Sequence, residues 1–524
     1  MVTHSKWFWP AALLTAWLAD FFFWSKVPGI SFPIWIGVAL LVGFLLSWRA
    51  GKRPLLWTVL LAVLTFFFSW VFAFRINAMT NFVSGLMVAG GLVLITATFL
   101  NGHWTTFRMV DYLTEGVKVI WAGFSRPFLS FSTPASPDVE GQVPQKSFWK
   151  RFAPVLRGLL ITLPVVAIFA ALFASADPVF NEGLRRLFNI ERLPEYILRL
   201  VLILLLGFWL VGMYLHAIAP ASESERPDPA KAWMKPFLGW TESGILLGAL
   251  NLLFIVFVIL QIRYLFGGSA NINETGFTYA DYARRGFNEL VWVAGLSLML
   301  FLLLSTITKL EKRSHQVGFT ALVVLLMANV LVILASSLAR LFLYESAYGF
   351  TQLRTVTHIF IFWLGGLVLA AAVLELLRQR GRFALVVLVA AIGFCMTLAI
   401  INVDGFVVRK NVNRAMVGEK LDVSYLNTLT DDAVPAMMTY YKDPAYSGVH
   451  EALGVTLACR AAELQKAPAL PWQSYHFGKA KADQLLAENS DLLSQVKLLK
   501  DANGYSFAEV NGEAVYCDNS NFMD

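Results

Sequence analysis

Three charged residues, Asp281, Arg285 and Glu289, recur at intervals of four within residues 264–290. On a helix this spacing puts a negative, a positive and a negative charge on one face. Thr278 with Asp281 three residues later is typical of a helix start. A long apolar run follows, and charge beside lipid is costly unless it is paired or hydrated. The triplet is either a self-paired helix end that anchors the next span, or the centre of a binding site.

Other acids and arginines stand at the ends of further apolar runs. Asp177 precedes Pro178, which is typical of a helix N-cap and its first turn. The segment 340–349 is expected to follow a span, and Asp404 stands at the end of the last one. These residues are either caps and salt bridges at the headgroup level, or a polar vestibule that binds an anionic headgroup, a sugar or a peptide. The candidate polar site comprises Asp177, Asp281, Arg284, Arg285, Glu289, Arg340, Glu345, Arg354 and Asp404.

The sequence lacks the short motifs that accompany common hydrolytic and metal chemistry. It has no HExxH, GxSxG or Walker loop, and its seven histidines follow no metal-ligand spacing. We therefore assign no catalytic residue, no metal site and no cofactor. An enzyme is the less favoured class, because one acting at the outer leaflet would need two acids close together, such as Asp281 and Asp404.

The composition indicates the class of protein. Of the 524 residues, 57% are hydrophobic and 15% are charged, and the mean hydropathy is +0.62. So much apolar surface predicts an all-α membrane protein, since lipid offers no partner for open backbone groups. A span takes about 20 apolar residues. This rule predicts eleven transmembrane helices, at 7–24, 33–48, 55–74, 82–100, 153–174, 195–217, 243–262, 288–308, 317–341, 357–377 and 383–402.

Changes in composition divide the chain into four parts. Residues 1–125 form an N-terminal section of four spans, and residues 126–152 are rich in Pro and Ser, as expected of a flexible cytoplasmic linker. Residues 153–402 form a core of seven spans. Residues 403–524 are polar enough to form a small soluble domain.

The C-terminal domain is predicted to be mainly helical. Helix starts are indicated by Asp443-Pro444, Leu470-Pro471 and Ser490-Asp491. Residues 507–516 alternate around Asn511-Gly512, a pair typical of a type I′ turn, so we expect the domain to end in a β-hairpin.

Basic residues predict the orientation of the spans. Lys and Arg are concentrated in alternate connections, such as residues 49–53, 309–313 and 378–382. This bias favours a cytoplasmic N-terminus, and an odd number of spans then puts the C-terminal domain outside. In that compartment Cys459 and Cys517 are permitted to form a disulfide, whereas Cys395 lies in a span and is expected to serve packing.

Several segments together resemble a known family. These segments are ASADPVF at 174–180, YLFGG at 264–268, GFTYADYARRGFNEL at 276–290, LYESAYGFTQLR at 343–354 and NVDGFVVRKNV at 402–412. The resemblance covers roughly residues 150–440, and YADYARRGFNEL is its most specific part. The family they resemble is a large bacterial family of polytopic membrane proteins known as a domain of unknown function (DUF4173/DUF4153-like). The resemblance implies a bacterial integral membrane protein and supplies no catalytic residues.

Three functions remain open at this stage. The first is a binding or regulatory protein of the bacterial inner membrane, with a polar site at the extracytoplasmic mouth of the bundle and an envelope partner bound through the C-terminal domain. The second is a transporter or lipid-handling permease, and the third is an outer-leaflet enzyme. Membrane lipids are expected partners. Nucleic acid is not, because no basic groove with interleaved aromatic residues is present.

Overall fold

The computed structural model describes most of the chain. The described residues are 7–132, Thr162, Val166, 169–170, 172–187, 193–219, 236–265, 287–502, 505–510 and 513–517. They fall into two compact units. The described residues within 1–24, 41–52 and 119–219 form one unit, and those within 25–40, 53–118 and 220–524 form the other. We call them the smaller and the larger unit.

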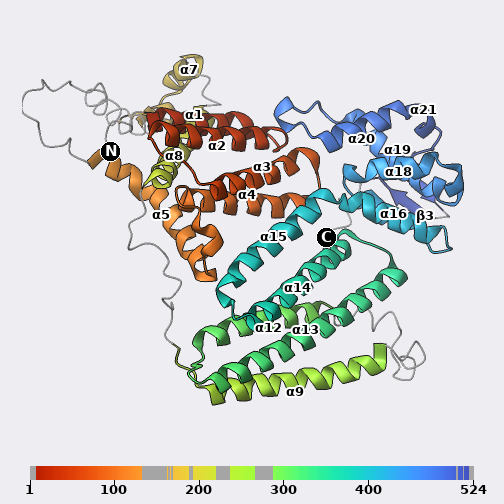
Figure 1. The fold of residues 1–524 in the computed structure, drawn as a ribbon. Helices are drawn as coiled ribbons and strands as arrows, with labels where there is room; N and C mark the ends of the chain where they lie inside the picture. The colour runs from red at the N-terminus through yellow and green to blue at the C-terminus, as the bar shows by residue number, and fades with distance from the viewer. Residues whose placement is uncertain are drawn as a thin grey trace, which may run out of the picture. The chain divides into compact units, whose positions relative to one another are not determined.

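Most of the described segments are α-helices (Figure 1). Those that precede the C-terminal domain are α1 (Phe8–Phe23), α2 (Ser31–Arg49), α3 (Leu56–Phe74), α4 (Ala78–Thr98), α5 (Met109–Ser132), α7 (Pro178–Leu187), α8 (Leu193–Ile218), α9 (Trp240–Leu265), α12 (Phe287–Ile307), α13 (Arg313–Tyr348), α14 (Gln352–Leu376) and α15 (Phe383–Ile400). Two 3₁₀ turns, η2 (His103–Thr106) and η5 (Arg380–Arg382), lie in connections.

The predicted all-α multi-pass membrane fold is confirmed. Within the described ranges, nine helices are long and apolar enough to cross a membrane. The first apolar run forms α1, whose 16 residues span about 24 Å at 1.5 Å per residue, less than a hydrocarbon core. The predicted span at 153–174 lies mostly outside the described residues, so the predicted number of eleven stays a prediction.

The smaller unit pairs α1 with α8. Ala12 and Ala16 pack against Leu210 and Val211. Near the other end of this pair, Asp20 and Arg199 form an ion pair with an O–N distance of 2.6 Å. A carboxylate within an apolar helix is therefore matched by an arginine from the neighbouring helix, as lipid requires.

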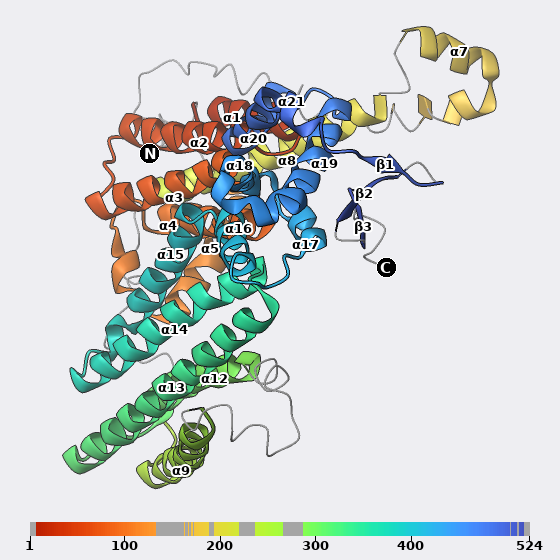
Figure 2. The ribbon, with the colours of Figure 1, turned by 90° about the vertical axis from the view of Figure 1, so that its right-hand side faces the viewer.

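The membrane helices of the larger unit form two packed groups (Figures 1 and 2). In the first, α9, α12, α13 and α14 share a core that includes Leu247, Phe301, Phe319, Leu326 and Val368. In the second, α3, α4 and α15 pack with the beginning of α2. Helix α14 contacts α15 and so links the two groups.

Two buried asparagines tie α9 to α13. Asn329 donates from Nδ2 to Asn251 Oδ1 at 3.2 Å, and Asn251 donates to the backbone oxygen of Leu322 at 3.0 Å. Polar side chains of this kind bond helices together in lipid. Both asparagines therefore serve to connect the two helices.

Helix α13 is longer than the predicted span 317–341. Its 36 residues cover about 54 Å, more than a bilayer core of about 30 Å. Arg340 and Glu345, expected in a segment after the span, are instead on the helix itself. This corrects the sequence interpretation. The helix ends only at Gly349, whose φ of 80° suits glycine.

Helix α5 also runs further than expected. It ends at Ser132 and contains Pro127, so residues 126–132 of the predicted linker are helical rather than irregular. The rest of the linker lies outside the described residues.

The C-terminal domain is mainly helical, as predicted. It contains α16 (Val403–Ala415), α17 (Val423–Thr428), η6 (Asp431–Ala433), α18 (Val434–Lys442), η7 (Pro444–Val449), α19 (His450–Lys466), η8 (Trp472–Ser474), α20 (Phe477–Glu488) and α21 (Ser490–Leu493). Its core gathers Val408, Leu426, Met437, Leu453 and Leu486.

The domain ends in three short antiparallel strands, β1 (Leu499–Lys500), β2 (Ser506–Val510) and β3 (Glu513–Tyr516), in the order β1-β2-β3. The pairing of Val510 with Glu513 closes the predicted hairpin, and its Asn-Gly turn lies outside the described residues. Cys459 of α19 and Cys517 after β3 are joined by a disulfide, which ties the sheet to the longest helix of the domain.

Candidate functional site at the junction of helix ends and C-terminal domain

The C-terminal domain contacts the segment before α2 and the connection between α3 and α4. The backbone N–H of Ile30 donates to the carbonyl of Tyr475 at 2.9 Å. The backbone N–H of Ile76 donates to the Asp432 carboxylate, also at 2.9 Å. Helix ends that meet another part of the protein need such partners for their free backbone groups.

Two further helix ends meet the same domain. The backbone N–H of Gln352, the first residue of α14, donates to the Tyr425 hydroxyl at 2.7 Å. Asn402, which precedes α16, donates from Nδ2 to the carbonyl of Asp432 at 2.6 Å. We call this contact region the junction. It is formed by 29–30, 75–77 and 350–352 at the helix ends, by 402–404 where the chain passes from α15 into α16, and by 425–432 and 474–478 of the domain.

Asp404 lies at the centre of the junction and is fully buried. Its Oδ1 accepts from Gln352 Nε2 at 2.5 Å and from Asn77 Nδ2 at 3.3 Å. Its Oδ2 accepts from the hydroxyl of Thr430 and from the Thr430 backbone N–H at 3.3 Å. Several hydrogen bonds to one carboxylate offset part of its loss of hydration. Asp404, in the first turn of α16, therefore joins the C-terminal domain to the beginnings of α4 and α14.

Asp432 is a second buried carboxylate in the junction. Burial raises the pKa of Asp432 above its usual range, and nearby Asp404 adds to the effect. The hydrogen bond from Ile76 and the charge of Arg75 act in the opposite direction. Arg75 itself donates to the carbonyls of Ala399 and Ile400 at the end of α15.

Two glycines allow backbones to approach closely here. A Cβ on Gly29 would lie 2.5 Å from the carbonyl oxygen of Tyr475, and one on Gly478 would lie 2.8 Å from that of Phe74. Backbone atoms cannot move aside as a flexible side chain can. Glycine is therefore needed at both positions for the domain to seat on the helix ends.

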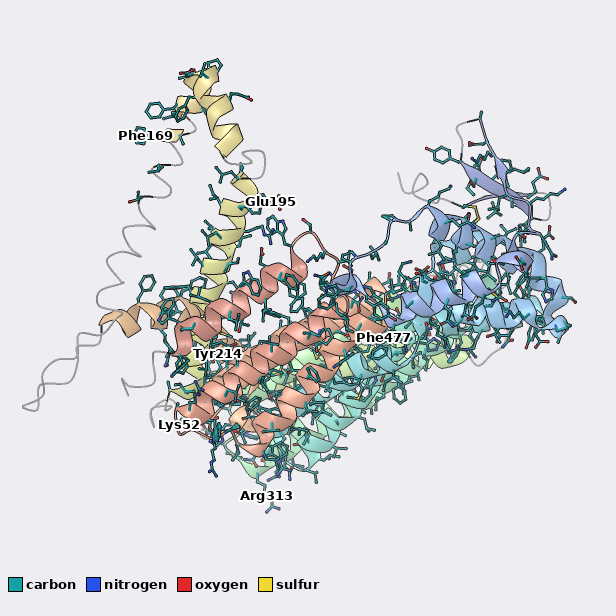
Figure 3. All side chains as sticks on the ribbon, turned by 90° about the horizontal axis from the view of Figure 1, so that it is seen from above. Lys52, Phe169, Glu195, Tyr214, Arg313 and Phe477 are labelled. Atoms are coloured by element: carbon teal, nitrogen blue, oxygen red, sulfur yellow. A yellow bond between two sulfur atoms is a disulfide. The ribbon has the colours of Figure 1, made fainter. Side chains whose placement is uncertain are left out.

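Aromatic rings complete the contact between α3 and the domain. Phe74 stacks on Phe477 with ring centroids 4.9 Å apart, and Tyr475 packs edge-on against Phe477. Figure 3 shows Phe477 where the domain meets the helices, and Arg313 at the opposite end of the bundle. Neighbouring His476 is mostly buried, and burial lowers its pKa.

Glu345 does not enter the Asp404 network. It is fully buried, and its Oε1 lies 3.2 Å from Nδ1 of His358 on α14. The pair bridges the end of α13 and the second turn of α14. Glu345 is one of the residues predicted for the candidate site, whereas His358 is not.

The two predicted arginines on α13 and α14 have local partners. Arg354 donates to the carbonyl of Gly349 and lies 4.0 Å from the centre of the Tyr344 ring, so it caps the end of α13. Arg340 is buried and donates to Gln261 Oε1 at 2.8 Å. The structure thus gives both a role in connecting helices.

Of the remaining predicted residues, Asp177 and Glu289 are described, and neither is among the residues that form the junction. Asp177 is exposed in the smaller unit and accepts from the backbone N–H of Val179 at 2.8 Å, as an N-cap does. Glu289 is exposed in the first turn of α12. Asp281, Arg284 and Arg285 lie outside the described residues, so the charge triplet stays a prediction.

A cavity of about 400 Å³ lies beside the junction, lined by residues of α13, α14, α15 and α16. Its wall is mostly aromatic and aliphatic and includes His358 and Lys410. Neither residue was predicted from the sequence, because neither belongs to a recognisable motif. His358 is a lone histidine in one apolar run, and Lys410 is a lysine that follows a later apolar run. One sequence feature does point to Lys410. It lies on α16, directly after the last apolar run and a short polar turn, which is a position near the membrane surface.

A family model described as Domain of unknown function (DUF4153) matches residues 12–440. The match extends the resemblance from residues 150–440 into the N-terminal spans. A search of curated proteins and a search of solved structures found no match. Within the described residues, no group of three or more His, Cys, Asp or Glu side chains could hold a metal ion. Because the model matches more than half of the sequence, the chain belongs to the DUF4153 family, whose domain is of unknown function.

Proposed function

We propose that this multi-pass membrane protein is a binding or regulatory protein of the bacterial cell envelope. The observation that supports this most is the junction, in which Asp404 and Asp432 bond the C-terminal domain to Ile76, Gln352 and Asn402. The carbonyl of Tyr475 adds a bond to Ile30, before α2. A movement of these helix ends is then passed to the domain through fixed polar contacts. Packed side chains and hydrogen-bond networks of this kind can carry the energetic coupling that regulation needs.

We propose that the domain faces the outside of the inner membrane. Basic residues at the opposite helix ends, such as Lys312, Arg313 and Arg380, support a cytoplasmic position for those ends. The test is labelling of single introduced cysteines by a membrane-impermeant thiol reagent. Lys442→Cys in the domain should react in intact spheroplasts, and Arg313→Cys should react only after lysis. The reverse pattern would reject this orientation.

A groove in the domain is the proposed partner surface. It has a volume of about 610 Å³ and lies between α18, α19 and β2. Lys442, His450, Glu451, Lys497 and Glu509 line it, so both signs of charge are available to an envelope protein. Mixed charge of this kind gives specificity to a protein contact.

The regulatory role is tested by photo-crosslinking in living cells. A photoreactive residue at Lys497 in the groove should form one defined protein adduct, and the same residue at exposed Lys466, away from the groove, should not. Combining the Lys497 probe with Gly478→Leu, which prevents seating of the domain, should change the yield of that adduct. An adduct equal at both probe positions, or unaffected by Gly478→Leu, would contradict regulation through the junction.

One observation favours transport as a second candidate. Gln261, Ser336 and Arg340 form a buried polar cluster between α9 and α13, with Ser336 donating to Gln261 at 2.9 Å. Polar groups within membrane helices often mark solute pathways. Proteoliposomes should then dissipate an imposed chloride or phosphate gradient, and Gln261→Ala should change the rate. No flux above that of protein-free vesicles would reject this candidate for these anions.

A further inference from the structure

The cavity beside the junction has the size of a ligand pocket, large enough for a headgroup and part of an acyl chain. It lies near the C-terminal domain, between the last turns of α13, the first turns of α14 and the last turn of α15. Its volume of about 400 Å³ is within the range of ligand pockets. From these features and those below we propose that the cavity binds one anionic phospholipid drawn from the bilayer. The proposal adds a ligand to the regulatory role and does not depend on a protein partner.

The cavity opens where membrane helices face lipid. Phe362 of α14 and Phe342 of α13 line it and are 75% and 54% exposed in the protein alone. Both belong to helices that are long and apolar enough to cross a membrane. Exposed aromatic rings on such helices contact lipid rather than water. An acyl chain can therefore enter the cavity from the side.

Lys410 supplies the positive charge at the mouth of the cavity. It lies on α16, beyond the last membrane helix, and its ammonium group is 5.6 Å from the ring centre of Phe406 and 5.8 Å from that of Phe350. Both rings line the same cavity, whose lining contains no acidic residue. A lysine at the headgroup level with apolar rings beside it suits a phosphate group joined to an acyl chain.

His358 supplies a second polar contact. Its Nδ1 lies 3.2 Å from Glu345 Oε1, which fixes the orientation of the ring. Its Nε2 is buried and has no hydrogen-bond partner among the described residues. A buried polar atom in the wall of a cavity is a position that a ligand can satisfy. A hydroxyl or phosphate group of a lipid headgroup provides the chemistry that is missing there.

The test measures lipid binding to the full chain purified in detergent, by native mass spectrometry with titrated lipid. Phosphatidylglycerol should bind at lower concentration than phosphatidylethanolamine with the same acyl chains. Lys410→Gln should weaken phosphatidylglycerol binding about fivefold. The matched control is Arg409→Gln, which removes the same charge from the next residue of α16 but not from the cavity lining, and it should leave binding within about twofold. Equal losses in both variants would overturn the proposal.

Two further variants test the cavity itself while keeping its charges. Ile359→Trp fills the space, and Phe362→Ala removes an exposed ring at the entrance, where the fold depends on it least. Each variant should weaken phosphatidylglycerol binding severalfold. Phe362→Ala should do so without changing the melting temperature. Native affinity in both would overturn the proposal. Glycerol phosphate in excess should not displace the lipid, and displacement would show that a soluble phosphate compound is the ligand instead.

Discussion

At one end of α14 the fully buried carboxylate of Glu375 accepts from Arg380 Nε at 2.6 Å and from Thr320 Oγ1 at 2.8 Å. At the other end the equally buried Asp404 accepts from neutral donors of Asn77, Gln352 and Thr430. The charged partner of Glu375 is five residues away in the sequence, whereas the partners of Asp404 come from segments 327, 52 and 26 residues away.

The two buried carboxylates therefore have different structural roles. The ion pair closes a local turn between α14 and α15, at the end of the bundle where basic residues gather. The hydrogen bonds from neutral donors to Asp404 join distant segments, at the end of the bundle that carries the C-terminal domain. An ion pair stabilises a fixed turn, while several weaker hydrogen bonds from separate elements allow the domain and the helix ends to adjust together. The regulatory proposal uses only the second kind of contact.

The largest effect is expected from Arg380→Ala. It leaves the Glu375 carboxylate buried without its cation, and breaking a buried ion pair costs about 3–5 kcal/mol. The melting temperature in detergent should fall sharply. Arg382→Ala, an exposed arginine of the same turn, is the control and should change it little. Adding Glu375→Gln to Arg380→Ala should recover part of the loss, and no recovery would contradict the assigned pairing.

A smaller effect is expected at the opposite end from Asp404→Ala. The side chains of Asn77, Gln352 and Thr430 then lose their shared acceptor in a buried place, at a cost of about 1–3 kcal/mol. Asp404→Asn keeps one acceptor oxygen and should lie between the native protein and Asp404→Ala in melting temperature. Exposed Glu451→Ala serves as the control in the same domain.

Hydrogen exchange distinguishes the two ends further. Asp404→Ala should speed exchange both in the first turn of α4 and around Thr430, because one carboxylate holds both. Arg380→Ala should speed exchange only near the turn between α14 and α15. Faster exchange at Thr430 alone in Asp404→Ala would mean that the junction does not couple the domain to the bundle.

Much of the fold could be predicted from the sequence because membrane helices are local. An apolar run must form a helix in lipid, so the positions of α3, α8, α14 and α15 follow from composition alone. The Asp177 cap was also predictable, since an Asp before a Pro has few structural alternatives. The length of α13 was not, because its last turns are polar and are held by the contact of Glu345 with His358 on another helix.

The candidate site was predictable only in part, for a related reason. Charged residues attract notice in an apolar sequence, and this is how Asp404 and Glu345 entered the candidate site. Their partners Asn77 and Gln352 are neutral, and their role depends on segments far away in the chain. Asp432 and Gly478 likewise look like ordinary surface residues until the domain is placed on the helix ends. No local pattern encodes such contacts.

The smallest effects are expected from pH, and they have opposite signs within the junction. Burial lowers the pKa of His476, so its contribution to stability is present above its ordinary value of about 6.5 and is lost as the pH falls through the lowered pKa. Burial raises the pKa of Asp432, so its contribution is present below the ordinary carboxyl value and is lost as the pH rises through the raised pKa.

The two contributions can be separated by melting the protein between about pH 4 and 7.5. His476→Gln should reduce the loss of stability on acidification below about pH 6.5. Asp432→Asn keeps an acceptor for the Ile76 N–H and should raise the melting temperature at neutral pH. Exposed His103→Gln, away from the junction, should follow the native profile. If His476→Gln and His103→Gln give the same melting profile, acid destabilises the protein at some other place. The junction, where Asp404 accepts from neutral donors, would then be no more sensitive to pH than the ion-paired end of α14.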